Sequence, residues 1–130
     1  MAEVRHLSIS IQRPWQTAYE YAANPANLPK WATGLGSAIR KIGSAWEADS
    51  PMGRVRIRFA APNGFGILDH DVVLESGETV YNPMRVIPNG GAAEVVFTLF
   101  RRPAMSEAQF AADGEWIAKD LRKLKAILEG

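Results

Sequence analysis

Residues 79–100, TVYNPMRVIPNGGAAEVVFTLF, decide the fold that the sequence predicts. Apolar and polar residues alternate along both halves of this stretch, which is the pattern of β-strands with one buried face. Between the halves, Asn89-Gly90 is typical of a two-residue hairpin turn. A turn centred there places Arg85 opposite Glu94, so opposite charges share the polar face. The stretch therefore predicts an antiparallel pair with one apolar side.

A second hairpin is predicted upstream, centred on Asn63-Gly64. The alternating segments on both sides of this turn then place Arg58 opposite Asp69 and Arg56 opposite Asp71. A slip of one residue would destroy these charge matches, because it moves every side chain to the other face. We therefore expect a meander of antiparallel strands.

The inner face of this meander is apolar except at two positions. Its predicted members are Val55, Ile57, Phe59, Leu68, His70, Val72, Leu74, Val80, Asn82, Met84, Val86, Val95, Phe97 and Leu99. The polar exceptions are His70 and Asn82. The predicted registers put Asn82 opposite Phe97 on one side and Val72 on the other, which leaves it diagonal to His70.

The N-terminal third predicts one strand, two short helices and two short strands. Residues 4–12 alternate as a half-buried strand. A helix follows and ends at Asn24-Pro25, since the residue before proline avoids helical geometry. A second short helix is expected over residues 26–33, then strands over 37–42 and 45–49.

The C-terminal stretch SEAQFAADGEWIAKDLRKLKAIL, residues 106–128, predicts a long amphipathic helix. It begins with the capping-box pattern of Ser106 and Gln109. Its apolar stripe consists of Phe110, Ile117, Leu121, Leu124 and Leu128. At about 1.5 Å per residue the helix spans roughly 30 Å, so it can cover a whole sheet.

Length and composition limit the class of protein. The 130 residues suit one domain over residues 1–130, and 47% of them are hydrophobic. The 15 basic and 14 acidic residues nearly balance, which argues against a nucleic-acid binder. Cysteine is absent, and we find neither a membrane-spanning run nor a secretion signal. We expect a cytoplasmic protein without an integral membrane segment, and a homodimer is one assembly that the sequence leaves open.

The order of elements resembles the START-like superfamily, and within it the polyketide cyclase/dehydrase and lipid-transport group (SRPBCC). The resemblance rests on Asn24-Pro25 to Trp31, on Asp69-His70, on residues 81–86 and on the closing helix. It implies an α+β helix-grip fold: a curved antiparallel sheet of about six to seven strands wrapped around the long C-terminal helix. Two short helices follow the first strand. It also implies a central cavity for a hydrophobic ligand, and no single activity.

The residues that we expect to contact a ligand lie on the inner wall, the short helices and the last helix. They are Trp31, Trp46, Ile57, Phe59, His70, Asn82, Met84, Phe97, Asp113, Trp116 and Ile117. His70 and Asn82 are also the candidate catalytic pair, with His70 as acid or base and Asn82 orienting a carbonyl. The alternative is a structural pair whose hydrogen bonds are satisfied. The tryptophans stack on a ligand or simply pack the short helices on the sheet.

Other motifs have simpler interpretations. We expect Arg54, Arg56 and Arg58 to form a neutralised outer face rather than an anion site. Neither a cofactor nor a metal is predicted, because His6 and His70 lie on different strands without ligand spacing.

Three functions remain open. The first is binding of a hydrophobic small molecule, lipid-, aromatic- or polyketide-like. The second is a cyclase or dehydratase that uses His70 and Asn82 in the same cavity. The third is a protein-interaction or co-chaperone module, which a cavity filled by the protein's own side chains would favour.

Overall fold

The computed structural model describes residues 1–35 and 39–130, and within them the chain runs strand, short helices, seven strands and one long helix. The elements are β1 (Val4–Ile11), α1 (Trp15–Ala23), the 3₁₀ turn η1 (Pro25–Asn27), α2 (Leu28–Trp31), β2 (Ile39–Ile42), β3 (Ala45–Ser50), β4 (Gly53–Phe59), β5 (His70–Val73), β6 (Thr79–Asn82), β7 (Met84–Asn89), β8 (Ala92–Phe100) and α3 (Glu107–Glu129). This order confirms the predicted α+β class. Of the strand expected over 37–42, residues 37 and 38 lie outside the described residues.

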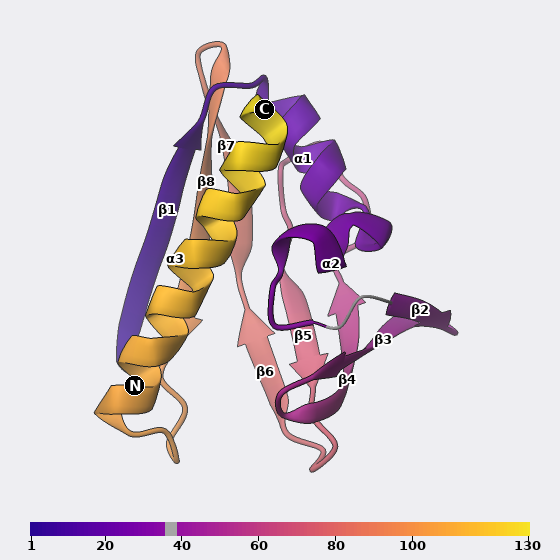
Figure 1. The fold of residues 1–130 in the computed structure, drawn as a ribbon, viewed down its shortest axis with the longest axis vertical. Helices are drawn as coiled ribbons and strands as arrows, with labels where there is room; N and C mark the ends of the chain where they lie inside the picture. Colours follow the sequence, from indigo (N-terminus) through magenta and orange to yellow (C-terminus); the bar gives the residue numbers. More distant parts are fainter. Residues whose placement is uncertain (36–38) are drawn as a thin grey trace.

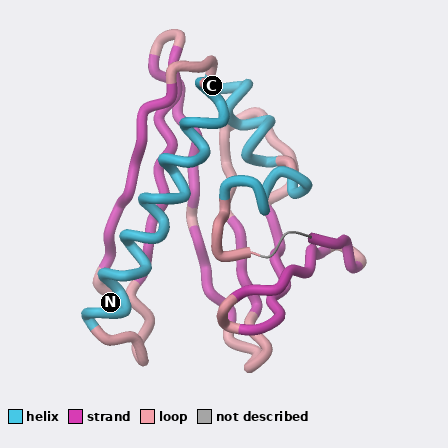
Figure 2. Tube along the Cα trace, in the orientation of Figure 1, coloured by secondary structure: helices cyan, strands magenta, loops and turns pink. Residues whose placement is uncertain are grey.

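The strands form two antiparallel sheets that the helices cover from one side (Figures 1 and 2). One sheet has the order β1-β8-β7 and the other β2-β3-β4-β5-β6. The long helix α3 lies along β1 and β8, while α1 and α2 lie beside it (Figure 1). Leu121 and Leu124 of α3 are fully buried and belong to one core with Ile11 of β1 and Val95 of β8.

Pro83 separates the two sheets. We predicted one strand through residues 80–86, but β6 ends at Asn82 and β7 begins at Met84. Proline cannot donate a hydrogen bond to a neighbouring strand, and Pro83 only accepts one, from the Thr98 N–H at 3.0 Å. The described residues therefore hold eight strands where about six to seven were expected.

Residues 66–68 rejoin the sheets across this break. The Val86 N–H donates to the Gly66 carbonyl at 2.8 Å, and the Leu68 N–H donates to the Met84 carbonyl at 2.9 Å. Because these bonds pass from the loop before β5 to β7, the wall bends continuously from one sheet to the other.

The predicted register of the β7–β8 hairpin is wrong by two residues. Asn89 pairs with Ala92, so the turn is Gly90-Gly91, not Asn89-Gly90. Arg85 therefore lies opposite Val96, while Glu94 accepts a hydrogen bond from the Asn89 side chain at 3.0 Å. A shift of two residues leaves each side chain on its predicted face, because the strand repeat is two.

The register of the second hairpin is also shifted by two. Arg58 pairs with Asp71, and the predicted partner Asp69 instead holds Arg85 through two bonds of 2.8 and 2.9 Å. The chain between β4 and β5 is a wider loop than a two-residue turn. The Asn63 side chain organises it by accepting from the Phe65 and Ile67 N–H groups.

The C-terminal helix begins as predicted. The Gln109 N–H donates to Ser106 Oγ at 3.1 Å, and the Ser106 N–H donates to Gln109 Oε1 at 2.9 Å. This reciprocal pair confirms the capping box. The predicted stripe faces the core: Phe110, Leu121 and Leu124 are buried, and Ile117 and Leu128 are partly buried.

Gly66 provides a stability test of the joint between the sheets. It has a φ of +73°, and a Cβ there would collide with the Val86 carbonyl oxygen. We expect Gly66→Ala to lower the free energy of unfolding by about 2–3 kcal/mol, through backbone strain and this clash. Gly77→Ala is the matched control, since Gly77 has a φ of +91° with open space around it. It should cost only about 1 kcal/mol. Equal losses in urea denaturation would contradict the role of Gly66.

Candidate functional site

A cavity of about 430 Å³ lies between the inner face of the sheets, α2 and α3. The sheets contribute Val55, Ile57, His70, Val72, Val80, Asn82, Phe97, Leu99 and Phe100, and α3 contributes Asp113, Trp116, Ile117, Asp120 and Leu121. Most of these groups are apolar. The volume falls within the roughly 300–1,000 Å³ of small-molecule sites.

Eight of the eleven residues expected at a ligand site line this cavity. They are Trp31, Ile57, His70, Asn82, Phe97, Asp113, Trp116 and Ile117. Three lie outside the lining: Trp46, Phe59 and Met84. Trp46 pairs with Ile57 on the inner face, one strand further from α3. Met84 is only 2% exposed and fills the core beside Phe97, its partner on β8.

His70 and Asn82 are direct cross-strand partners. The predicted diagonal placement is wrong, because the β5–β6 register is also shifted by two and brings Asn82 opposite His70. Directly opposed residues have Cβ atoms about 4.5–5.5 Å apart, so both side chains reach the same part of the cavity. In the described residues the Asn82 amide has no side-chain hydrogen bond, which leaves its donor and acceptor for an occupant.

The His70 ring is fixed from three sides. Its Nδ1 lies 2.9 Å from the Leu68 carbonyl oxygen. A carbonyl can only accept, so Nδ1 carries the proton and Nε2 of the neutral ring is an acceptor. The ring centroid lies 5.8 Å from that of Phe59 and 6.1 Å from that of Phe97. Phe59 therefore supports His70 rather than lining the cavity.

Burial lowers the pKa of His70 below its ordinary value of 6.5. The hydrogen bond to Leu68 and the charges of Asp69 and Asp71 oppose this shift but are smaller. The imidazole is therefore neutral near pH 7, as a hydrogen-bond acceptor or a general base requires.

Two carboxylates of α3 face the cavity, and the sequence prediction included only one of them. Asp113 and Asp120 are seven residues apart, so they lie on one face of the helix. Asp120 accepts from the Thr33 N–H at 3.1 Å and from Thr33 Oγ1 at 2.7 Å. The helical spacing from Asp113 is the signal that could have identified Asp120.

Burial raises the pKa of both carboxyl groups. For Asp113 the positive charge of Arg102 opposes the effect, and for Asp120 the Thr33 hydrogen bonds do so. Arg102, which follows the end of β8, also lines the cavity. Its Nη1 lies 3.0 Å from Glu78 Oε1.

Two tryptophans occupy different depths. Trp31 is 6% exposed, and its Nε1 has no hydrogen-bond partner among the described residues. Trp116 is 46% exposed and lies over Gly34, where a Cβ would come within 3.5 Å of Trp116 Nε1. Met52 lines the same cavity and is 57% exposed. Trp116 and Met52 thus form an apolar rim.

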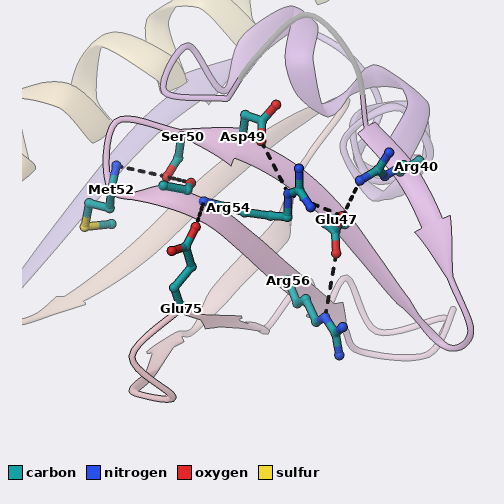
Figure 3. Close-up of polar contacts among 9 residues, drawn as sticks. Arg40, Glu47, Asp49, Ser50, Met52, Arg54, Arg56 and Glu75 are labelled. Atoms are coloured by element: carbon teal, nitrogen blue, oxygen red, sulfur yellow. Dashed lines mark hydrogen bonds and ion pairs between the residues drawn. The ribbon is translucent and has the colours of Figure 1, made fainter.

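The outer face of the sheet is polar and carries a group of ion pairs around Glu47 (Figure 3). Glu47 is 8% exposed and lies 2.6 Å from Arg40, 3.6 Å from Arg54 and 3.8 Å from Arg56. The hydrogen bond from Arg40 lowers the pKa of the Glu47 carboxyl. Glu47 therefore pairs with Arg54 and Arg56 in place of the predicted aspartates, and Arg54 also lies 3.8 Å from Asp49. Among the described residues Arg58 makes no ion pair, so the expected neutralisation holds for Arg54 and Arg56 alone.

Two further features were sought in the described ranges 1–35 and 39–130: a metal site and a membrane-spanning helix. No group of three or more histidine or acidic side chains there could hold a metal ion. None of the helices there combines the length and the apolar composition that crossing a membrane requires.

Comparisons with solved structures show the fold. A START superfamily protein from Mycobacterium smegmatis aligns with a TM-score of 0.73 and 11% identity, over 97% of each chain. Ara h 8.0201 aligns with a TM-score of 0.71 and 10% identity, over 99% of each chain. DynU16, from the dynemicin biosynthetic locus, has a TM-score of 0.75 and 16% identity, over 99% of this chain and 48% of its own. This chain therefore has the START-type helix-grip fold that the sequence predicts.

Sequence comparison adds nothing to this result: no protein-family model matches the chain, and neither does any curated protein.

The neutral His70 gives a prediction about stability and pH. Since the folded-state pKa lies below 6.5, the unfolded chain binds the proton first as the pH falls. The stability from neutral His70 is complete above about pH 6.5 and is lost as the pH falls through the folded-state pKa, by at most about 1.4 kcal/mol per pH unit. We therefore expect His70→Gln to flatten the decline between pH 7 and pH 5 in urea denaturation.

The other groups that face the cavity do not obscure this comparison. Asp113 and Asp120 have raised pKa values, so they add stability as the pH falls, equally in both proteins. Asp69 has a lowered pKa and loses its contribution below the ordinary value of 3.8. The control is His6→Gln, which makes the same substitution at an exposed position of β1, outside the cavity. A slope that His70→Gln leaves unchanged would show that His70 is not buried as a neutral group.

Proposed function

We propose that this protein binds an apolar small molecule in the cavity between α3 and the curved sheet wall. The observation that carries the proposal is the unfilled volume of about 430 Å³ under the helix. An apolar space of this size, with a few polar groups at fixed positions, is typical of a ligand site.

The energetics favour a ligand of at least two rings or a comparable chain. Burying roughly 300 Å² of apolar surface gains about 7.5 kcal/mol. Association costs about 4 kcal/mol or more in lost motion. Apolar contact alone therefore gives weak binding, and the polar groups of the cavity must supply the remaining affinity and the specificity.

The fold neighbours are compatible with this proposal. DynU16 comes from a biosynthetic locus, which suits a ligand or substrate of biosynthetic origin. The open cavity makes the third hypothesis, a protein-interaction module with a filled interior, the least supported.

The cytoplasmic location and the homodimer that the sequence analysis considered stay predictions.

A second candidate is an enzyme in the same cavity. The neutral ring of His70 directly opposite the free amide of Asn82 is the observation that favours it. Nε2 would remove a proton next to a ligand carbonyl, and the Asn82 amide would stabilise the developing enolate oxygen.

Binding can be tested with the neutral fluorescent probe N-phenyl-1-naphthylamine. We expect a saturable increase in its emission at a ratio of one to one. Val72→Phe, which places a ring in the cavity, should weaken binding at least about tenfold, or about 1.4 kcal/mol. The matched control is Val73→Phe, one residue further along β5 and on the opposite face. If both variants bind like the wild type, the probe does not occupy the cavity.

The enzymatic candidate can be tested through enolisation. We expect the wild type to accelerate deuterium exchange at C2 of 1-tetralone in D₂O, as followed by NMR. His70→Gln should abolish the acceleration but change the affinity for N-phenyl-1-naphthylamine by less than about threefold, or 0.7 kcal/mol. Exchange at the buffer rate, or equal exchange in both proteins, would rule against His70 as the base.

A further inference from the structure

The charged groups that line the cavity are unbalanced. They are Arg102 from the β8–α3 loop and Asp113 and Asp120 from α3. Arg102 is already engaged by Glu78 at 3.0 Å. The cavity therefore has one neutralised cation and two carboxylates, and its field is unfavourable for a ligand that carries negative charge.

The two carboxylates differ in the number of hydrogen bonds that they accept. Asp120 accepts two hydrogen bonds from Thr33. Asp113 has no hydrogen-bond partner among the described residues, although it is partly buried and faces an apolar space. A carboxylate in such a place costs free energy unless a donor reaches it. Asp113 is thus an acceptor without a donor.

The rest of the lining has the same need for polar partners. Nε2 of His70 is an acceptor, since Nδ1 donates to Leu68. The indole N–H of Trp31 lacks an acceptor within the described part of the chain, but it has almost no accessible surface, so it offers an occupant no contact. A hydroxyl group is both donor and acceptor, so it can donate to Asp113 and to Nε2 of His70, whereas a carboxylate can only accept and suits neither of them.

We propose that the cavity selects apolar ligands that carry hydroxyl donors and no negative charge, with Asp113 as the residue that sets this preference. This inference rests on the proposed binding function and adds the chemical class of the ligand. It separates phenols and alcohols, which can donate to Asp113, from fatty acids and aryl carboxylates, which Asp113 and Asp120 repel.

Three probes with one skeleton test the preference: biphenyl, 4,4′-dihydroxybiphenyl and biphenyl-4,4′-dicarboxylate. Near neutral pH the diol is uncharged and the dicarboxylate is a dianion. By isothermal titration calorimetry we expect the diol to bind at least about tenfold more tightly than biphenyl, which is about 1.4 kcal/mol. The dicarboxylate should bind more weakly than biphenyl.

Asp113→Asn should reduce the ratio of diol to dicarboxylate affinity at least about fivefold, or roughly 1 kcal/mol. Glu115→Gln is the matched control, because it removes the same charge two residues away, at an exposed position outside the cavity lining. This variant should keep the wild-type ratio.

The outcomes separate the two proposals. If biphenyl binds but the wild type takes the dicarboxylate as tightly as the diol, the preference is refuted and the binding function stands. The same conclusion follows if Asp113→Asn behaves like Glu115→Gln. If none of the three probes binds, the proposed function fails and the preference fails with it. The wild-type comparison decides the matter even if Asp113→Asn does not fold.

Discussion

The long helix α3 packs on only one part of the curved wall, and this limited contact determines where the cavity forms. Its apolar stripe is anchored on β1 and β8, where Leu121 and Leu124 join the core around Ile11. A single helix cannot also fill the space above β4, β5 and β6. The inner side chains of these strands therefore face α2 and one side of α3 across the cavity. The cavity is therefore a consequence of covering a wide sheet with one helix.

The polar groups of the cavity come from both sides of this space and are not equivalent. On the sheet, His70 is oriented by a backbone carbonyl and two aromatic rings, and Asn82 stands directly opposite it. On α3, Asp113 and Asp120 share one face, and only Asp120 has protein donors. The sheet side thus supplies a rigid neutral pair and the helix side supplies negative charge. An occupant that spans the cavity meets both.

The face of each residue could be predicted from the sequence, but its exact neighbours could not. Alternation fixes which side chains point inward, so His70, Asn82 and Phe97 were assigned to the inner wall correctly. Register depends on loop geometry, and the Gly90-Gly91 turn and the wide loop around Asn63 each shift the pairing by two residues. The wrong register also gave Asp69 the wrong partner, because its actual partner Arg85 lies in the other sheet. The place of Arg102 in the cavity could not be predicted, because this residue lies beyond the last strand, where no alternation indicates which way a side chain points.

Both proposals require an open and apolar space under α3. A crystal of the protein under xenon pressure tests it most directly, because xenon enters dry apolar cavities. We expect xenon density among Ile57, Val72 and Val80, with the surrounding side chains unmoved. A structure without xenon there, in which Trp31 or Phe97 fills the volume instead, would show that the protein has no open cavity under α3.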